Sequence, residues 1–323
     1  MPKITDTPPQ EVLTKLEKLR KSLDTQIPAK TLDRNLLIAT WNIRAFGNLT
    51  EKWLTDDNDS PKRDLYAVRC IAEIISRFDV IAIQEVREDL KALRHTLKVL
   101  GPEWGLILTD VTRGDAGNSE RLAFLFDTRR VQLSGLACEL VVPKEQLVEI
   151  GPDALRQQFA RTPYAVSFQS HGNTFILVTL HVLYGSKAAD RVPELKAIAT
   201  WLAEWAKGIN SWHHNLIVLG DFNIDRQGDP LYDAFTSTGI AAPGDLNEVP
   251  RSIFDKADKG KFYDQIAWFT GNNGVPALSL DYVRGGSFDF VPVVYPTSGL
   301  TRQQISWRIS DHYPLWAEFS VRD

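Results

Sequence analysis

The most informative stretch of this sequence is Leu216-Ile217-Val218-Leu219-Gly220-Asp221-Phe222-Asn223. Its first four residues are apolar, and a short run of this kind is typical of a strand buried inside a sheet. An aspartate and an asparagine follow the run almost directly. Because these two residue types dominate turns, one such pair on its own indicates only the end of a strand.

The same arrangement recurs at four other places along the chain. At each of these places, a predicted strand has a carboxylate, amide or imidazole at one end, where a loop is expected. These residues are Asn42 after residues 36–41, Gln84 and Glu85 after 80–83, His181 after 175–180, and Asp311 and His312 before 314–321. Five such strand ends are hard to explain by turn chemistry alone. Because strand ends of one sheet lie close in space, the sequence predicts a single polar cleft.

The residue types in this predicted cleft indicate a metal and acid–base chemistry. Carboxylate and amide oxygens without thiolates suit Mg²⁺ or Mn²⁺ better than a structural zinc. Two histidines in the same cleft could act as an acid and a base. Together these groups fit hydrolysis of a phosphate ester, in which catalysis depends mostly on positioning and charge neutralisation. The oxygen ligands would come from Asn42, Glu85, Asp221, Asn223 and Asp311.

The rest of the chain predicts one large domain behind a short leader. Residues 1–35 contain Thr7, two prolines and then apolar residues at helical spacing, which predicts a capped amphipathic helix docked on its own domain. Residues 36–323 combine strands with helices over about 65–78 and 190–208. We expect them to form a single α+β domain in which helices cover sheets. Residues 285–306 are the best candidate for a substrate-facing loop.

Composition restricts the class of protein and its surroundings. The chain has 323 residues, of which 43% are hydrophobic and 24% charged, and this excludes disorder, collagen and coiled coil. It has two cysteines, no secretory signal pattern and no apolar run long enough to span a membrane. We therefore expect a cytoplasmic protein without a membrane partner, and a monomer as the default. The net charge of −4 at first argues against a phosphate-rich partner.

Six short motifs together resemble a known family. They are Trp41-Asn42-Ile43, Gln84-Glu85, His181, Gly220-Asp221-Phe222-Asn223, Tyr263-Asp264-Gln265-Ile266 and Ser310-Asp311-His312-Tyr313-Pro314. Their order and approximate spacing are similar to those of the endonuclease/exonuclease/phosphatase superfamily, over roughly residues 36–320. The resemblance implies a four-layer αββα sandwich, in which two stacked mixed β-sheets are flanked by helices.

Within that superfamily, the chain resembles the deoxyribonuclease I-like branch. The stretch Ile83-Gln84-Glu85-Val86-Arg87 resembles the first metal-site motif of the branch, and Arg161-Thr162-Pro163 resembles its phosphate-contacting element. Residues 260–266 do not match the Pro-x-Trp-Cys-Asp-Arg element of the inositol phosphatase branch. The resemblance therefore disfavours that branch. Asn118 stands where the deoxyribonuclease branch has a tyrosine that stacks on nucleic acid.

The resemblance implies three groups of site residues. The metal ligands for Mg²⁺ or Mn²⁺ would be Glu85, Asn42, Asp311 and Asp221. The catalytic residues would be His181, His312, Asp264, Glu120, Asp221 and Asn223. The substrate-binding residues would be Arg161, Arg87 and Asn223. In this scheme His312 is the general base, oriented by Asp264, and His181 is the general acid, oriented by Glu120.

The implied site also changes the meaning of the net charge. Five of the acidic residues would lie in the site, and without their negative charges the net charge of −4 becomes +1. These residues are Glu85, Glu120, Asp221, Asp264 and Asp311. A polyanionic substrate is therefore compatible with the composition, although binding should be sensitive to salt and to the metal.

The resemblance implies a Mg²⁺-dependent phosphodiesterase whose partner is nucleic acid. The leading hypothesis is a DNA endonuclease of low sequence specificity that hydrolyses the P–O3′ bond with a water activated by the His–Asp pair. One alternative is a phosphoesterase that acts on a small-molecule or lipid phosphate, as a phosphatase or a sphingomyelinase does. A second alternative is a binding module without catalysis. It requires the loss of an essential group, and all the matched metal and acid–base residues are present.

Overall fold

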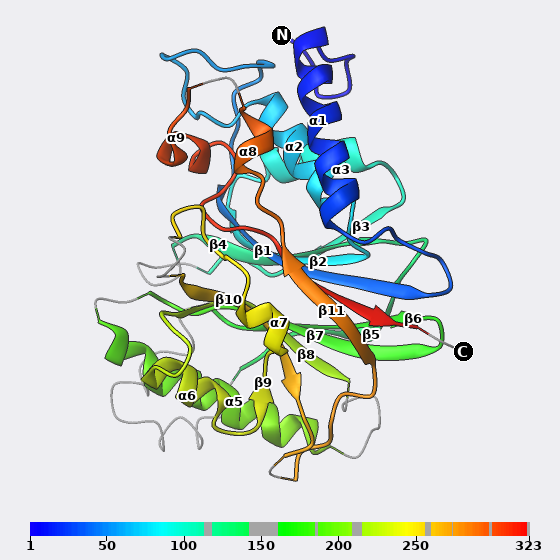
Figure 1. Ribbon diagram of the computed structural model, residues 1–323, viewed down its shortest axis with the longest axis vertical. Helices are drawn as coiled ribbons and strands as arrows, with labels where there is room; N and C mark the ends of the chain where they lie inside the picture. The colour runs from blue at the N-terminus through cyan, green and yellow to red at the C-terminus, as the bar shows by residue number, and fades with distance from the viewer. Residues whose placement is uncertain are drawn as a thin grey trace.

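The structure, a computed structural model, describes residues 1–112, 118–141, 161–184, 187–208, 215–255, 260–272, 274–296 and 299–321. Its main strands form two six-stranded sheets of mixed direction, stacked face to face (Figure 1). In spatial order, the first contains β11 (Asp281–Ser287), β12 (Leu315–Ser320), β1 (Asn35–Phe46), β2 (Val80–Arg87), β4 (Glu120–Asp127) and β3 (Trp104–Leu108). The second contains β5 (Gln132–Glu139), β6 (Tyr164–Ser170), β7 (Asn173–His181), β8 (Leu216–Ile224), β10 (Phe262–Phe269) and β9 (Ile240–Ala241).

Helices cover the outer face of each sheet, and three apolar cores fill the spaces between the four layers (Figure 1). The helices on the first sheet are α1 (Gln10–Gln26), α2 (Leu65–Ile75), α3 (Lys91–Leu100) and the short α8 (Val291–Val294). Those on the second are α5 (Val192–Ala206) and α6 (Pro230–Thr236). The middle core lies between the two sheets. The predicted α+β class and the four-layer αββα sandwich are confirmed.

The central strands are buried on both faces, which explains their continuous apolar runs. In β8, Leu216 and Val218 belong to the core beneath α5 and α6, whereas Ile217 and Leu219 belong to the core between the sheets. Side chains alternate between the faces of a strand, so a strand covered on both sides needs apolar residues at every position. The stretch 216–219 therefore indicates a layer on each side of its sheet.

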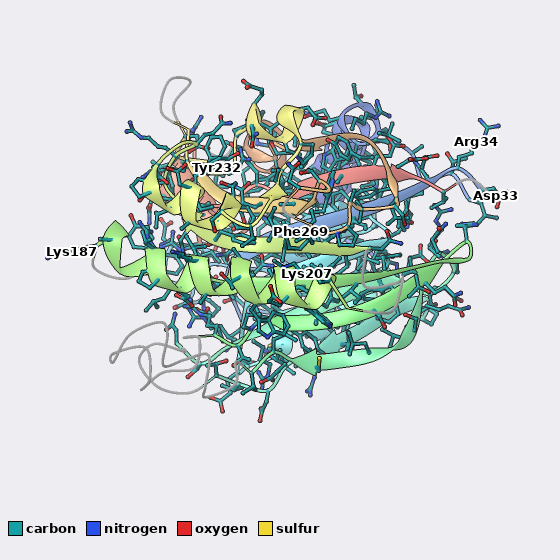
Figure 2. All side chains as sticks on the ribbon, turned by 90° about the horizontal axis from the view of Figure 1, so that it is seen from below. Asp33, Arg34, Lys187, Lys207, Tyr232 and Phe269 are labelled. Carbon is teal, nitrogen blue, oxygen red and sulfur yellow. The ribbon has the colours of Figure 1, made fainter. Side chains whose placement is uncertain are left out.

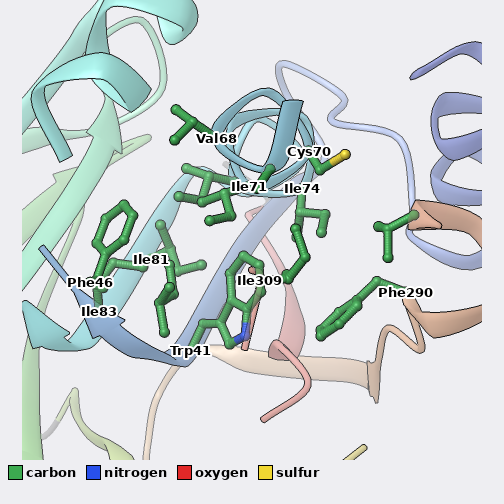
Figure 3. Packing of buried hydrophobic residues seen from close by; sticks show 14 of the residues in the cluster. Trp41, Phe46, Val68, Cys70, Ile71, Ile74, Ile81, Ile83, Phe290 and Ile309 are labelled. Atoms are coloured by element: carbon green, nitrogen blue, oxygen red, sulfur yellow. The ribbon is translucent and has the colours of Figure 1, made fainter. Parts of the chain in front are cut away.

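Helix α2 is the clearest of the helices that cover the first sheet. The Asp64 carboxylate caps its first turn by accepting a hydrogen bond from the Ala67 N–H. On the face of the helix towards the sheet, Ile71 and Ile74 point to Trp41 on β1 (Figure 3), and all three are completely buried. Burying each isoleucine stabilises the fold by about 1.5–3 kcal/mol.

Helix α5 covers the second sheet in the same way. It follows a short 3₁₀ turn, η2 (Ala188–Arg191). Between Lys187 and Lys207 it covers the sheet and runs in nearly the same direction as the strands (Figure 2). Leu195, Ile198 and Leu202 are buried and form its inner stripe. The helix predicted over about 190–208 is therefore confirmed within two residues at each end.

Helix α1 packs its apolar face on α2 and α8, and Leu16, Leu19 and Leu23 are buried in the core of the first sheet. The predicted cap at Thr7 is wrong, because Pro9 holds the N-cap position and no side chain caps the helix. A residue that precedes a proline is kept out of the helical conformation, so the two prolines delay the start of the helix. A domain boundary at residue 35 stays a prediction. Within the described ranges, no helix is both long and apolar enough to cross a membrane.

Three strands continue past the polar residues that were expected to end them. Asn42, Glu85 and Asp221 all lie inside strands. The backbone turns near them instead, because Glu85 and Asn223 adopt φ values of 60° and 51°, and the pairing of β1 and β2 shifts register beyond Asn42. A single residue with positive φ bends a strand without ending it. The predicted strand ends are therefore bends.

The elements that the sequence did not predict include α3, β3 and β11. The predicted loop over 285–306 is wrong in its described part, because it contains the end of β11, α8 and α9 (Arg302–Ser306). Two glycines explain why β11 was missed. A Cβ at Gly285 would lie 2.5 Å from Leu246, at the end of α7 (Gly244–Asn247), and one at Gly286 would lie 2.7 Å from the Trp316 ring. Close packing requires glycine at both positions, and glycine hides the strand pattern.

Candidate active site

Three neighbouring strands of the second sheet bring acidic and imidazole side chains together. β8 pairs with β7 so that Asp221 lies opposite His181, and with β10 so that Asp221 lies opposite Asp264. Neighbouring strands are about 4.8 Å apart. The register of the sheet alone therefore places these three residues side by side.

Gly220 permits the close approach of β7 and β8 at this point. Its φ is 143°, and a Cβ there would lie 2.1 Å from the carbonyl oxygen of Leu180. That oxygen is on the neighbouring strand and belongs to the residue before His181. A glycine immediately before Asp221 therefore fixes the distance between the carboxylate and the imidazole.

Replacing Gly220 with alanine is expected to lower the free energy of unfolding by about 3 kcal/mol or more, because the new methyl group must displace backbone. Gly135→Ala is the matched control, since Gly135 also has a positive φ, 107°, but a Cβ there would meet nothing within 4 Å. We expect the control to lose only about 1 kcal/mol. Urea denaturation of both variants measures the difference, and equal losses would show that crowding at Leu180 is unimportant.

Asp221 is the centre of the cluster. Its carboxylate accepts hydrogen bonds from Asn42 Nδ2 at 3.0 Å and from the Asn223 N–H at 2.9 Å. It lies 3.6 Å from His181 Nε2 and 3.9 Å from His312 Nε2. Burial alone would raise the pKa of Asp221, but the two imidazoles and the hydrogen bonds outweigh burial and lower it. Asp221 is therefore a buried carboxylate between two histidines.

His312 is oriented by a second buried carboxylate. Its Nδ1 lies 2.7 Å from Asp264 Oδ2, in a hydrogen bond, so Nε2 is the nitrogen that faces Asp221. Burial alone would lower the pKa of His312, but Asp264, Asp221 and Asp311 raise it well above its usual range. In the absence of a cation, the proton that the pair shares therefore lies on His312.

His181 forms the corresponding pair with Glu120, which lies on β4 of the other sheet. Its Nδ1 is 3.1 Å from Glu120 Oε2, an ion-pair distance, although neither atom makes a well-directed hydrogen bond. Burial raises the pKa of Glu120, but His181, Arg161 and Arg87 outweigh burial and lower it. Two His–carboxylate pairs, each with Nε2 towards Asp221, therefore meet where the edges of the two sheets approach each other.

The remaining predicted oxygen ligands lie on the first sheet and beside β12. The Glu85 carboxylate accepts a hydrogen bond from the Ala45 N–H at 2.8 Å. Asp311 is half-buried, and its Oδ2 lies 3.4 Å from Arg44 Nη1. Asn42 links this group to Asp221 through its amide nitrogen. The hydrogen bond from Asn42 to Asp221 thus joins a predicted ligand on the first sheet to one on the second.

These residues fit a divalent cation. The Oδ1 atom of Asn42 is buried and has no hydrogen-bond partner, which is costly unless something else contacts it. Carboxylate and amide oxygens are the donors that Mg²⁺ and Mn²⁺ prefer. Over the described part of the chain, no three His, Cys, Asp or Glu side chains form a closed metal site by themselves. Mg²⁺ needs none, because it usually keeps several waters and binds one or two carboxylates.

The sequence model of the Endonuclease/Exonuclease/phosphatase family matches residues 39–312, which include nearly all of this cluster. This chain belongs to that family. A deoxyribonuclease of Thioalkalivibrio sp. (strain K90mix) is 27% identical to it over 293 residues, which cover 88% of this chain and 71% of that protein. Deoxyribonuclease-1 of Bos taurus is 27% identical over 202 residues, which cover 60% of this chain and 62% of that protein.

Solved structures agree on the fold. A mannosyl-6-phosphatase from Bacteroides thetaiotaomicron VPI-5482 matches with a TM-score of 0.54 and 18% identity, over 88% of this chain and 99% of that chain. The catalytic domain of human nocturnin matches with a TM-score of 0.55 and 16% identity, over 88% and 94% respectively. The family resemblance that the motifs predicted is confirmed, and the chain is a member of a family of nucleases and phosphoesterases.

Two arginines predicted to contact substrate both lie beside Glu120 in the protein. Arg161 is buried, and its Nε lies 2.7 Å from Glu120 Oε2. Arg87 donates a hydrogen bond to the carbonyl oxygen of Asn118 at 2.6 Å and lies 3.4 Å from Glu120 Oε1. Both guanidinium groups thus hold the carboxylate partner of His181. Their predicted contact with substrate stays a prediction.

No sequence pattern indicated Arg63, which supports the backbone of the same site. Its side chain is buried, and its guanidinium donates to the carbonyl oxygens of Arg44, Ala45, Arg308 and Ile309, at 2.6–3.2 Å. The first two lie beyond Asn42 on β1, and the last two precede the Ser310-Asp311-His312 segment. Arg63 thus ties together two segments that carry predicted metal ligands. A lone arginine in a loop has no pattern that would predict this role.

A groove of about 590 Å³ opens beside His312. Tyr313 and Ser252 line it, and Ser252 forms an isolated β-bridge with His312. Its lining also includes the cationic side chains Arg226, Lys261 and Arg302 and the acidic side chains Glu248, Asp255 and Asp289. The groove provides space beside the backbone of His312, with side chains of both signs, and among the described residues the side chains of the acid–base cluster do not line it.

Proposed function

We propose that this protein is a divalent-metal-dependent phosphodiesterase that cuts DNA endonucleolytically with low sequence specificity. One observation carries the proposal. Two histidines, each with its own carboxylate, direct Nε2 towards the same Asp221. The distance is 3.6 Å from His181 and 3.9 Å from His312. A proton acceptor and a proton donor on one centre suit hydrolysis of a phosphodiester, in which the attacking water loses a proton and the leaving oxygen gains one.

The histidines divide the proton transfers in this proposal. His312, held by Asp264, takes a proton from the attacking water through Nε2. His181, held by Glu120, gives a proton to the leaving O3′ oxygen through its own Nε2. Asp221, on which both rings converge, keeps the two nitrogens on the same reaction centre. Asn223 supports this geometry, because its side chain donates to the Val182 carbonyl at 2.6 Å and its backbone N–H to Asp221.

Glu85, Asn42, Asp311 and Asp221 would hold Mg²⁺ or Mn²⁺, which when bound supplies positive charge to the phosphate oxygens. Asn42 presents its unpartnered Oδ1 for this purpose. Arg44 lies 3.4 Å from Asp311 and competes for that carboxylate in the absence of a cation. A positive charge beside Asp311 also favours the neutral form of His312, which is the form that a general base needs.

DNA is the proposed substrate for two reasons. The two relatives named as deoxyribonucleases match this chain over 293 and 202 residues. The groove beside the His312 backbone carries Arg226, Lys261 and Arg302, which can contact single phosphates, although Glu248, Asp255 and Asp289 also line it. Binding that depends on such surface cations carries no sequence information, which agrees with low specificity.

Incubation of supercoiled plasmid with the protein tests the proposal. We expect nicking and linearisation with Mg²⁺ or Mn²⁺ and none with EDTA, because without the cation the phosphate charge is not neutralised. His181→Ala should abolish the reaction as EDTA does, since the leaving oxygen loses its proton donor.

Intact plasmid under every metal condition would contradict the proposal. If the same preparation released phosphate from small phosphomonoesters or lipid phosphates, the site would be a phosphoesterase of another substrate class. His171→Ala is a suitable control, because His171 lies at the turn between β6 and β7 and contacts none of the site residues in the described structure.

A further inference from the structure

Three aromatic side chains are exposed among the residues that the structure describes. They are Tyr184, Phe254 and Trp307, with 54%, 44% and 48% of their surface accessible. A single exposed apolar ring needs no explanation. Each of the three, however, is connected to residues of the site through its own contacts or through its neighbours in the chain. We call these three residues the aromatic rim.

Trp307 is held rigidly beside a proposed metal ligand. The guanidinium carbon of Arg44 lies 3.8 Å from the centroid of its ring, a close cation–π contact. The same guanidinium lies 3.4 Å from Asp311 and donates a hydrogen bond to Ser306 Oγ at 2.8 Å. Arg44 thus orients the indole against one of its faces, while about half of the residue remains open to solvent.

Tyr184 is connected to the other side of the site. Its ring makes an edge contact with Tyr263, with centroids 6.3 Å apart, and Tyr263 in turn contacts the His312 ring at 5.7 Å. Arg191 lies over the Tyr184 ring at 4.7 Å. This tyrosine is therefore separated from a proposed catalytic group by one aromatic ring, and it has an arginine on its own ring.

Phe254 belongs to the segment that pairs with the Asp311–His312 backbone. The N–H of the preceding residue, Ile253, donates to the Asp311 carbonyl at 2.9 Å, and Ser252 forms a β-bridge with His312. Arg302 donates to the Ile253 carbonyl and so fixes this segment to α9. The third ring is thus presented by backbone that is tied directly to the site.

We propose that the aromatic rim stacks unpaired bases of a single-stranded nucleic acid next to the phosphate that reacts. Every base offers a π-face to an aromatic ring, but in a duplex both faces are covered by neighbouring base pairs. Arg44 and Arg191, which lie on two of the rings and are paired with Asp311 and Asp225, hold those rings in place for stacking. The inference rests on the proposed function and specifies its substrate: a single strand is bound and cut in preference to a duplex.

Steady-state cleavage by single alanine variants of the three rim residues tests this inference. The substrates are a labelled single-stranded DNA, the same sequence as a duplex, and a labelled strand of the same length with abasic sugars, which offers phosphates but no ring to stack. Each variant should raise KM for the single strand about tenfold, the effect of losing one stacked base, with kcat nearly unchanged. Rates on the abasic strand should stay at the wild-type value. Trp307→Phe keeps a ring and should retain most of the affinity.

Leu133→Ala is the matched control, because Leu133 is 47% exposed but lies on the edge strand β5. Unchanged single-strand KM values in all three rim variants would overturn the inference. So would loss of binding to phosphatidylserine vesicles in those variants with DNA cleavage intact, which would make the rim a membrane contact. If the wild type cleaves none of the substrates, the proposed function fails. Fluorescence anisotropy of the labelled single strand then still decides whether the rim binds it.

Discussion

The His312→Ala variant is expected to turn over DNA more slowly than the wild type by a factor of about 10³ to 10⁴, the usual contribution of a positioned acid or base. The imidazole connects Asp264, at 2.7 Å from Nδ1, to the centre of the cluster, where Nε2 lies 3.9 Å from Asp221. Alanine removes this proton acceptor. Single-turnover rates with Mg²⁺ at saturating DNA measure the loss without interference from product release.

The fold should survive this substitution. The backbone of His312 makes its own bonds: its carbonyl accepts from Trp41 Nε1 at 2.8 Å, and its N–H donates to Ser310 Oγ at 3.0 Å. Asp264→Asn should cost nearly as much activity as His312→Ala, and the double variant little more, because the two residues act as a unit. His95→Ala is the control, since His95 bonds to the Lys91 carbonyl on α3. A wild-type rate in His312→Ala would contradict the acid–base assignment.

The elements that could be predicted from the sequence are those buried on both faces. β8 and β1 show continuous apolar runs because a layer covers each side. The missed strand β11 is largely exposed and lies at the edge of its sheet. An edge strand exposes much of its surface, so its sequence lacks the apolar pattern on which the prediction depends.

The acid–base cluster was predictable for a related reason. His181, Asp221 and Asp264 follow or interrupt strongly apolar strands, and once neighbouring strands pair in register such residues must lie side by side. What the sequence did not indicate is that β2 and β8 bend at Glu85 and Asn223 and then continue. A positive φ at a non-glycine residue depends on the surrounding structure, and no local residue pattern reports it.

The supporting residues could not be predicted at all. Arg63 gathers four carbonyl oxygens from two segments that are more than 200 residues apart in the chain. Arg44 likewise meets Trp307 only because β1 and α9 come together in the folded protein. Such contacts depend on tertiary structure alone, so an isolated arginine or tryptophan in the sequence looks like any surface or core residue.

Asp221→Asn tests the charge at the centre of the cluster most directly. The substitution keeps the shape of the side chain and removes the negative charge towards which both histidines point. We expect kcat with Mg²⁺ to fall by a factor of about 10³, the scale of losing a preorganised charged group at a reacting centre. We also expect the melting temperature at neutral pH without metal to fall, because the pKa of Asp221 is lowered in the folded protein, so its charged form stabilises the fold.

The neighbouring groups suit the charged form of Asp221. Asn42 Nδ2 and the Asn223 N–H both donate to its carboxylate, and the Nε2 atoms of His181 and His312 face it. An amide at position 221 keeps one acceptor oxygen and replaces the other with a donor, so it loses part of these interactions. Asn42→Ala is the matched control, because it removes one of these hydrogen bonds and keeps the charge, so it should melt closer to the wild type. Thermal melting of both variants, with and without Mg²⁺, measures the contrast. If Asp221→Asn kept the activity of the wild type, Asp221 would not be the centre of a reaction site.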